Sequence, residues 1–193
     1  MFKMDGKEFA SQEEWQMWLW LEEALMYDLV KNYIYQPVSL SLSPRQTIQV
    51  KKQLKTKTKM VDKFLLHPHS YQADFLIEVT DKFISLFNHG LTVYKPTADP
   101  NHGIEATVFC IDVKGAWGGI NHSAREFSIN QKWLFHEHGI FVNSVVPEKW
   151  FKRTWLPERL RTTLKSGKPS KSKKWIGCKT YKEQNDKTNK RRK

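Results

Sequence analysis

The chain has 193 residues and 22.8 kDa, which suits one domain of ordinary size with an appended segment and is long enough to bury a core. Hydrophobic residues make up 39% and aromatic residues 13%, so a chain that is disordered throughout is excluded. The two cysteines indicate no disulfide framework and favour a reducing compartment. The most apolar run, Trp15 to Leu21, is too short to cross a bilayer, and no signal peptide is recognisable. We expect a soluble, cytoplasmic protein without a membrane partner.

The net charge of +12 is unevenly distributed along the chain. Residues 149–193 hold 17 Lys/Arg and 3 Asp/Glu, a net charge of +14, whereas residues 1–148 carry −2. Such asymmetry favours a polyanionic partner, with nucleic acid ahead of a membrane surface, although a solubilising tail is the alternative for the last dozen residues. We therefore divide the chain into a core, 1–148, and a basic, partly disordered nucleic-acid-binding extension, 149–193.

Within the extension, cations alternate with tryptophans, a combination that suits phosphate contacts and stacking on unpaired bases. The tryptophans Trp150, Trp155 and Trp175 serve equally well as packing anchors. Phosphate contacts supply affinity without sequence selection. The candidate nucleic-acid-binding residues are Lys149, Lys152, Arg153, Arg159, Arg161, Lys165, Lys168, Lys171, Lys173 and Lys174.

The first half of the chain predicts one helix followed by extended segments. A capping-box pattern at Ser11 to Glu14 opens a helix that the apolar period carries to about Lys31. Tyr33 to Leu42 alternates and is expected to be extended, and Tyr71 to Val79 predicts a strand. The basic segment Gln46 to Val61 is compatible with either a strand or a loop.

The second half predicts strands around another helix. Phe83 to Phe87 and Leu91 to Tyr94 suggest a hairpin, and the apolar run Ala106 to Val113 suits a central strand covered on both faces. A helix is expected from Ser123 to His138, ended by a glycine, and a strand from Ile140 to Val146. The order helix, several strands, helix, strand predicts an α/β fold with a mixed central β-sheet flanked by helices.

Three charged residues fall on the predicted strands. Asp112 and Lys114 are two residues apart, so both side chains leave the same face of their strand. Asp74 lies inside another apolar strand, and if the two strands are neighbours the two aspartates can share one divalent cation. Hard carboxylate ligands suit Mg²⁺, with Mn²⁺ as a substitute. This hypothesis requires the three side chains to converge in the fold.

The arrangement resembles the PD-(D/E)XK nuclease superfamily. The first half of the motif is Ala73-Asp74, without the proline, and the second is Asp112-Val113-Lys114, after 37 intervening residues. The Tyr-Gln-Ala-Asp-Phe strand and the Asp-Val-Lys-Gly strand end are similar to those of small phage-encoded endonuclease and resolvase-like proteins. The resemblance implies a restriction-endonuclease-like core and a metal-dependent DNA endonuclease, cytoplasmic in the host cell if phage-encoded.

The resemblance also implies two further site residues. Members often carry a glutamate on the first core helix, which implies Glu14 as a third carboxylate ligand of the metal. They also often carry a polar residue on the helix after the lysine, which implies Gln131 as a catalytic residue that supports the geometry of the site. Glu14 is also the carboxylate of the capping box, and Gln131 could equally be an ordinary helix-edge residue. The implied substrate is DNA in recombination or replication, branched or single-stranded, with RNA left open. Resolving enzymes usually dimerise, so a homodimer is also open, although the sequence shows no clear dimer surface.

Other interpretations of the polar residues are weaker. The histidines match no compact zinc pattern, and the glycines at 115, 118 and 119 lack the GK[ST] that completes a phosphate-binding loop. The main rival function is a non-catalytic nucleic-acid-binding protein whose nuclease-like core is only structural.

Overall fold

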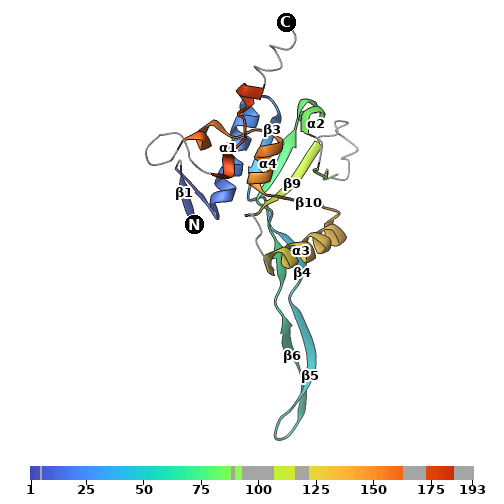
Figure 1. Cartoon of the computed structure of the whole chain (residues 1–193). Helices are drawn as coiled ribbons and strands as arrows, with labels where there is room; N and C mark the ends of the chain where they lie inside the picture. Colours follow the sequence, from blue (N-terminus) through green and yellow to red (C-terminus); the bar gives the residue numbers. More distant parts are fainter. Residues whose placement is uncertain (5, 88–89, 93–106, 116–121, 163–172, 185–193) are drawn as a thin grey trace.

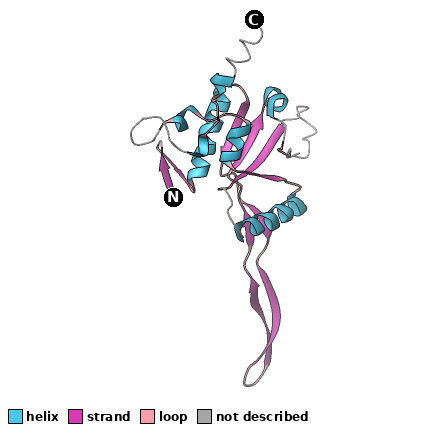
Figure 2. Cartoon of the chain, viewed as in Figure 1, coloured by secondary structure: helices cyan, strands magenta, loops and turns pink. Residues whose placement is uncertain are grey.

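The computed structural model describes residues 1–4, 6–87, 90–92, 107–115, 122–162 and 173–184, and their fold is α/β (Figure 1, Figure 2). The strands are β1 (Phe2–Met4), β2 (Lys7–Phe9), β3 (Val30–Tyr35), β4 (Leu40–Ser43), β5 (Gln46–Gln53), β6 (Thr58–Leu66), β7 (His69–Tyr71), β8 (Phe75–Val79), β9 (Thr107–Val113) and β10 (Val142–Val145). The helices are α1 (Gln12–Met26), α2 (Asp81–Phe87), α3 (His122–His138) and α4 (Pro147–Arg153), with 3-10 turns at Glu158–Arg161 and Lys173–Trp175.

The main sheet has four strands in the order β10-β9-β8-β3. Strands β3, β8 and β9 pair antiparallel, and β10 joins the edge parallel to β9 after the chain has passed through α3. In chain order this unit contains α1, β3, β8, α2, β9, α3 and β10. The α/β class and the mixed sheet predicted from the sequence are confirmed.

Apolar side chains cover both faces of the sheet. Odd-numbered residues of β8 and β9, such as Phe75 and Ile111, pack in the larger core with α1. The opposite face presents Cys110, which packs in a smaller core with Phe127 and Leu134 of α3. Since side chains alternate along a strand, Asp112 and Lys114 fall on the α3 face with Cys110. The strand β9 is covered on both faces, as its continuous apolar run predicts.

Helix α1 begins as its sequence predicts but ends five residues earlier than expected. The Ser11 side chain accepts a hydrogen bond from the Glu14 amide at 3.1 Å, the predicted N-cap. The helix ends at Met26 because Asp28 adopts φ +56° and the Leu29 amide donates to the Ala24 carbonyl, a Schellman arrangement. Aspartate stands where glycine is usual, so this stop signal was missed.

The hairpin predicted around Phe83 to Phe87 is wrong, because this segment is helix α2. Thr80 caps its first turn: the Phe83 amide donates to the Thr80 hydroxyl at 3.4 Å, and the Ile84 amide donates to the Thr80 carbonyl at 3.2 Å. Local side-chain capping therefore outweighs the β propensity of the phenylalanines. The second half of the predicted second strand, residues 93 and 94, lies outside the described residues.

The undecided basic segment is a two-stranded antiparallel ribbon that projects from the body (Figure 1). We call β5, β6 and the turn between them, residues 46–66, the arm. At its base the chain continues into β4 and β7, which pair antiparallel next to α3. The predicted strand Tyr71 to Val79 is accordingly split into β7 and β8, with Asp74 at the bend between them.

The segment after residue 148 packs on α1 and completes the larger core. Trp155 is fully buried, stacks on Trp20 with ring centroids 4.5 Å apart, and donates its indole N–H to Glu23 at 2.9 Å. Tyr181 stacks on Tyr27 with centroids 4.0 Å apart. The tryptophans of this region thus include packing anchors. None of the described helices combines the length and the apolar character needed to cross a membrane.

Candidate metal centre

The two aspartates meet because of the register between β8 and β9. Phe75 pairs with Ile111 in an antiparallel ladder, so the preceding Asp74 faces Asp112. The ladder continues through the Asp74 amide, which donates to the Ile111 carbonyl at 3.1 Å. Inserted residues between the two strands do not disturb this pairing. The sequence-based requirement that the two carboxylates converge is therefore met.

Asp112 is buried, with 4% of its surface exposed, and two side chains share its carboxylate. The Tyr71 hydroxyl donates to Oδ2 at 2.6 Å, and Lys114 Nζ lies 2.8 Å from Oδ1. Burial and the neighbouring Asp112 carboxylate raise the pKa of the Tyr71 phenol, so the hydroxyl stays a donor. A buried carboxylate is costly unless it is paired, and here both of its oxygens are.

Asp74 is held against the end of β9. Its Oδ2 accepts a hydrogen bond from the Val113 amide at 2.6 Å, and its carboxyl group is hydrogen-bonded to Asp112. Burial is the main cause that raises the pKa of Asp74 to about 8, and the contact with Asp112 adds to it. A negative charge on Asp74 is therefore disfavoured next to Asp112, and a bound cation would offset that repulsion.

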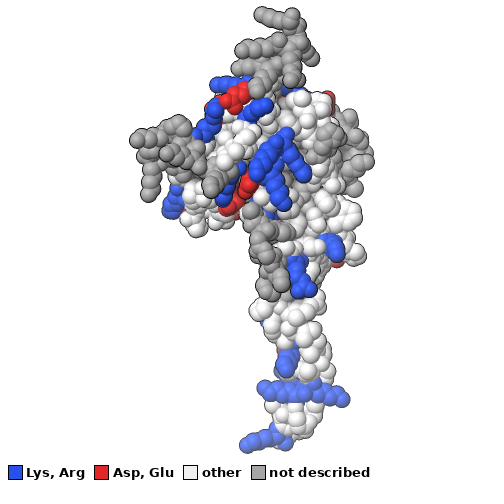
Figure 3. Space-filling model, in the orientation of Figure 1, with Lys and Arg blue, Asp and Glu red and all other residues white. Residues whose placement is uncertain are grey.

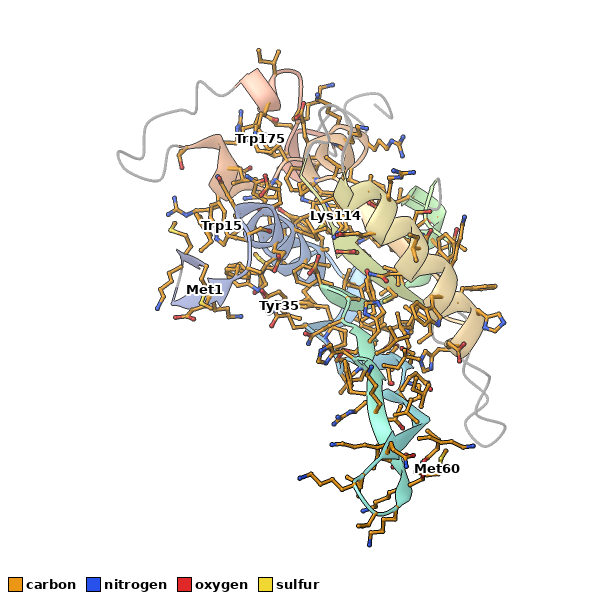
Figure 4. The ribbon with its side chains drawn as sticks, turned by 90° about the horizontal axis from the view of Figure 1, so that it is seen from below. Met1, Trp15, Tyr35, Met60, Lys114 and Trp175 are labelled. Carbon is orange, nitrogen blue, oxygen red and sulfur yellow. The ribbon has the colours of Figure 1, made fainter. Side chains whose placement is uncertain are left out.

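Lys114 occupies the more open side of this pair. Its ammonium lies 5.6 Å from the ring centroid of Phe127 on α3, and its side chain is 27% exposed. Together with Glu13 and Gln16 of α1 it lines a small cavity of about 20 Å³. Figure 4 shows Lys114 between α1 and α3. A cation at this place can reach a ligand that approaches from solvent.

Glu14 lies close enough to Asp74 to raise the pKa of that carboxyl group, but its own oxygens are engaged. Oε1 accepts from the Ser11 hydroxyl at 2.9 Å, and Oε2 accepts from the Tyr35 hydroxyl at 2.8 Å and the Ala10 amide at 3.3 Å. Glu14 is 5% exposed. The structure therefore shows the capping role directly, with Glu14 at the edge of the aspartate pair.

Gln131 is not brought to the aspartates by any described contact. Its amide group donates to the Val142 carbonyl at 2.5 Å and so ties α3 to strand β10. Val142 pairs with Cys110, two residues before Asp112. Gln131 lies four residues beyond Phe127, which is next to Lys114, and its contact is the one expected of a helix-edge residue.

Two tyrosines in this region were not singled out from the sequence. Tyr71 donates to Asp112, and Tyr35 donates to Glu14. Tyr71 lies three residues before Asp74 in a polar stretch. A tyrosine so close in the sequence to a buried acid is the signal that could have identified Tyr71 as a site residue. Tyr35 could not have been found in this way, because it reaches Glu14 only through the packing of α1 against β3.

The donor set fits one divalent cation held by two carboxylates. Asp74 and Asp112 offer hard oxygen ligands in contact with each other, and a divalent cation would offset the repulsion between their negative charges. Among the described residues, no group of three or more His, Cys, Asp or Glu side chains has the geometry of a metal site. A cation here would therefore depend on two protein carboxylates and on water or substrate oxygens.

The basic residues predicted to contact nucleic acid are at the surface wherever their side chains are described. Figure 3 shows Lys and Arg side chains gathered over α4, beside a small acidic area. Lys152 pairs with Glu148 at 2.8 Å and Arg161 with Glu183 at 2.9 Å, whereas Lys149 and Arg153 line an open cavity of about 290 Å³. Arg159 and Lys174 are exposed. Lys165, Lys168, Lys171 and the side chain of Lys173 lie outside the described residues.

Comparisons with known proteins supply no further constraint. A scan against protein-family models, a search of curated proteins and a search of solved structures each found no match. The chemical interpretation of this site therefore depends on its own geometry.

Proposed function

We propose that the protein is a Mg²⁺-dependent DNA endonuclease that hydrolyses phosphodiester bonds and selects DNA structure rather than sequence. The observation that carries the proposal is the meeting of Asp74, Asp112 and Lys114 at the end of one buried strand. Two carboxylates in contact with each other and a lysine 2.8 Å from one of them form the minimal constellation for metal-assisted hydrolysis. Branched or single-stranded intermediates of recombination or replication are the proposed substrates.

Each residue has a distinct part in this chemistry. Asp74 and Asp112 would hold Mg²⁺, or Mn²⁺ in its place, which supplies an oriented water and offsets charge on the phosphate. The water oxygen forms a bond to phosphorus as the water releases a proton to solvent, the bond from phosphorus to the leaving oxygen breaks, and that oxygen takes up a proton from solvent. Lys114 donates hydrogen bonds to the attacking water or to the phosphate oxygens as negative charge builds there. Tyr71 keeps the Asp112 carboxylate oriented.

Two observations support the nuclease class. Helix α1 precedes the strands of the sheet and helix α3 follows the strand that carries Asp112, and the nuclease interpretation relies on a helix at each of these two places. The spacing Asp112-Val113-Lys114 places the acid and the lysine on one face, in an ion pair. In this proposal Glu14 supports Asp74 from α1, and Gln131 positions the helix that carries Phe127.

The exposed cations of α4 and the following segment would hold the DNA backbone. Lys149 and Arg153 occur one helical turn apart, and no carboxylate among the described residues pairs with either of them. Contacts of this kind neutralise phosphates and release counterions, so they give affinity that falls with salt and contributes no sequence preference. Selection of DNA structure then depends on the shape that the whole surface accommodates.

The test uses purified protein with Mg²⁺, Mn²⁺ or EDTA on supercoiled plasmid, single-stranded, flap and four-way DNA. We expect cutting with either metal and none with EDTA. Asp112→Asn and Lys114→Met should lower the cutting rate at least about 10³-fold, because metal and transition-state contacts are lost. The matched control is the exposed ion pair Lys3–Glu8, whose variants Lys3→Met and Glu8→Gln should cut normally.

The outcomes separate the two functions that the sequence leaves open. Cutting that survives both Asp112→Asn and Lys114→Met would contradict the proposed site. DNA binding without cutting of any substrate, in either metal, would favour the non-catalytic nucleic-acid-binding protein instead. Near-ultraviolet circular dichroism of each variant shows whether the fold is retained.

A further inference from the structure

The arm is long, basic and without a tertiary partner along most of its length. Strand β6 has nine residues, which corresponds to about 30 Å at roughly 3.3 Å per residue. Nearly every arm residue is exposed on both faces of the ribbon, and Figure 4 shows Met60 far from the body. An isolated two-stranded ribbon is marginally stable in water, so such an arm is more readily understood if a partner binds it.

The charge of the arm indicates the chemistry of that partner. The arm has six cations and one carboxylate, Asp62, which accepts a hydrogen bond from Gln49 on the neighbouring strand, and Arg45 adds a seventh cation at its base. Figure 3 shows Lys and Arg side chains at several levels of the arm down to its tip. The cations are Arg45, Lys51, Lys52, Lys55, Lys57, Lys59 and Lys63.

The register places part of this charge where it opposes folding. Lys52 and Lys59 are direct cross-strand partners and lie on one face with Lys63, which is opposite Ile48. Like charges directly opposite each other destabilise a ribbon, and within the described part of the chain neither Lys52 nor Lys59 forms an ion pair. An external polyanion would remove this repulsion. The turn adds Lys55 and Lys57, both fully solvent-facing.

The dimensions of the arm match a groove of double-stranded DNA. The major groove is about 12 Å wide and admits a two-stranded ribbon, and one helical turn of DNA is about 34 Å long. We infer that the arm is a second DNA-contacting element, which inserts into a groove of the duplex next to the cutting site and grips the flanking phosphates. The choice of DNA as partner rests on the proposed function.

The base of the arm connects directly to the candidate metal centre. Strand β6 continues within a few residues into β7, whose last residue, Tyr71, donates to Asp112. Strand β4, which continues into β5, pairs with β7. A duplex held along the arm would therefore be anchored beside the carboxylates. Basic groups of the arm and of α4 would then contact the DNA from two separate elements.

The experiment measures DNA affinity as a function of salt in EDTA, in an Asp112→Asn background that prevents cutting. Two double variants remove charge from the arm: Lys52→Gln with Lys59→Gln, and Lys55→Gln with Lys57→Gln. Each should weaken duplex binding about tenfold or more at 0.1 M salt and reduce the salt slope by up to about 1.8, since each phosphate contact contributes about 0.9. The corresponding Lys→Arg variants should restore the slope.

The matched control is Lys3→Gln with Lys31→Gln, which removes the same charge from two exposed, carboxylate-paired lysines of the body. Arm variants that bind duplex DNA like this control would overturn the inference. The inference would also be overturned if the arm variants changed the oligomeric state measured by light scattering but not the salt slope of DNA binding, because the arm would then bind a second copy of the chain. If DNA binding depends on the arm but the protein cuts no substrate, only the proposed endonuclease function is contradicted. If the protein cuts DNA but its binding does not depend on the arm, only the inference about the arm is contradicted.

Discussion

The phenol of Tyr71 connects the Asp112 carboxylate to the strand at the base of the arm, through a 2.6 Å hydrogen bond. Its partner oxygen belongs to the same carboxylate that pairs with Lys114. The sequence predicted Asp112 and Lys114 together because one strand fixes both on one face. It could not predict Tyr71 as their neighbour, since that contact depends on the bend at Asp74 and on the register of β8 with β9.

Replacement of this phenol should weaken metal binding without unfolding the protein. Tyr71→Phe removes the donor to Asp112 Oδ2, and loss of such an orienting partner typically costs about 10- to 100-fold in metal affinity. Isothermal titration with Mn²⁺ measures the change. The control is Tyr33→Phe, because the Tyr33 hydroxyl also donates to a carboxylate, that of Glu22, away from the site. Equal affinities of the two variants would show that Tyr71 has no orienting role.

The raised pKa of Asp74 should make the stability of the metal-free protein depend on pH. The pKa of Asp74 is raised from 3.8 to about 8 in the folded state, chiefly by burial. The folded protein therefore holds this proton more tightly than the unfolded chain, so the stabilisation is complete below about pH 4 and is lost as the pH rises towards 8. Urea unfolding in EDTA between pH 5 and 9 should show this decline, and Asp74→Asn should flatten it. If the unmodified protein and Asp74→Asn showed the same dependence of stability on pH, Asp74 would not be the group that causes it.

At the scale of elements, a helix or strand was predicted correctly when the contacts that determine it are between residues close in the sequence. The N-cap of α1 and the apolar strand β9 follow from neighbouring residues, and both were predicted. Helix α2 was not predicted, because three phenylalanine and isoleucine side chains in this segment favour a strand and Thr80, which caps the helix, was not taken into account. The sequence does not distinguish a strand from a loop in the arm, for a different reason. Both of its faces are exposed, so no apolar alternation marks it as a ribbon.

The contact between α3 and β10 gives a test at this scale. Gln131→Met keeps the size of the side chain but removes the amide that donates to the Val142 carbonyl. We expect a loss of about 1 kcal/mol in the free energy of unfolding, the usual net value of such a bond, with little change in cutting rate. Urea unfolding and the plasmid assay measure the two quantities. The exposed neighbour Lys132, changed to Met, should alter neither. A cutting rate that falls more than about tenfold while stability is kept would instead place Gln131 in the catalytic machinery.

For the whole molecule, the charge distribution divides the sequence into a nearly neutral part and a basic one, but charge alone did not show how the two parts pack. The core continues past residue 148 through Trp150, Phe151 and Leu160, and it closes over α1 with Trp155 and Tyr181. The charge of a surface is related to the partner that it binds, whereas the packing of a segment is determined by its apolar side chains. The two patterns therefore overlap in this segment instead of dividing it from the core.

Truncation should show this dependence. A chain that ends at residue 148 loses five buried core residues and is expected to lose its cooperative thermal unfolding transition, whereas one that ends at residue 184 should keep it. Trp155→Ala in the full chain should lower the free energy of unfolding by about 3–5 kcal/mol, because a fully buried stacked ring is removed. Circular dichroism at increasing temperature measures each change. A truncated 1–148 chain with an unchanged transition would contradict this account of the core.

The hydrogen bond from the Val113 amide to Asp74 has a practical consequence for spectroscopy. One backbone proton, in the middle of the motif Asp112-Val113-Lys114, points at the carboxylate that would exchange its proton for a cation. Its nuclear magnetic resonance shift should therefore move when Mg²⁺ is titrated in, without any substrate present. Selective ¹⁵N-valine labelling would make this amide a reporter of metal occupancy that does not depend on an activity assay.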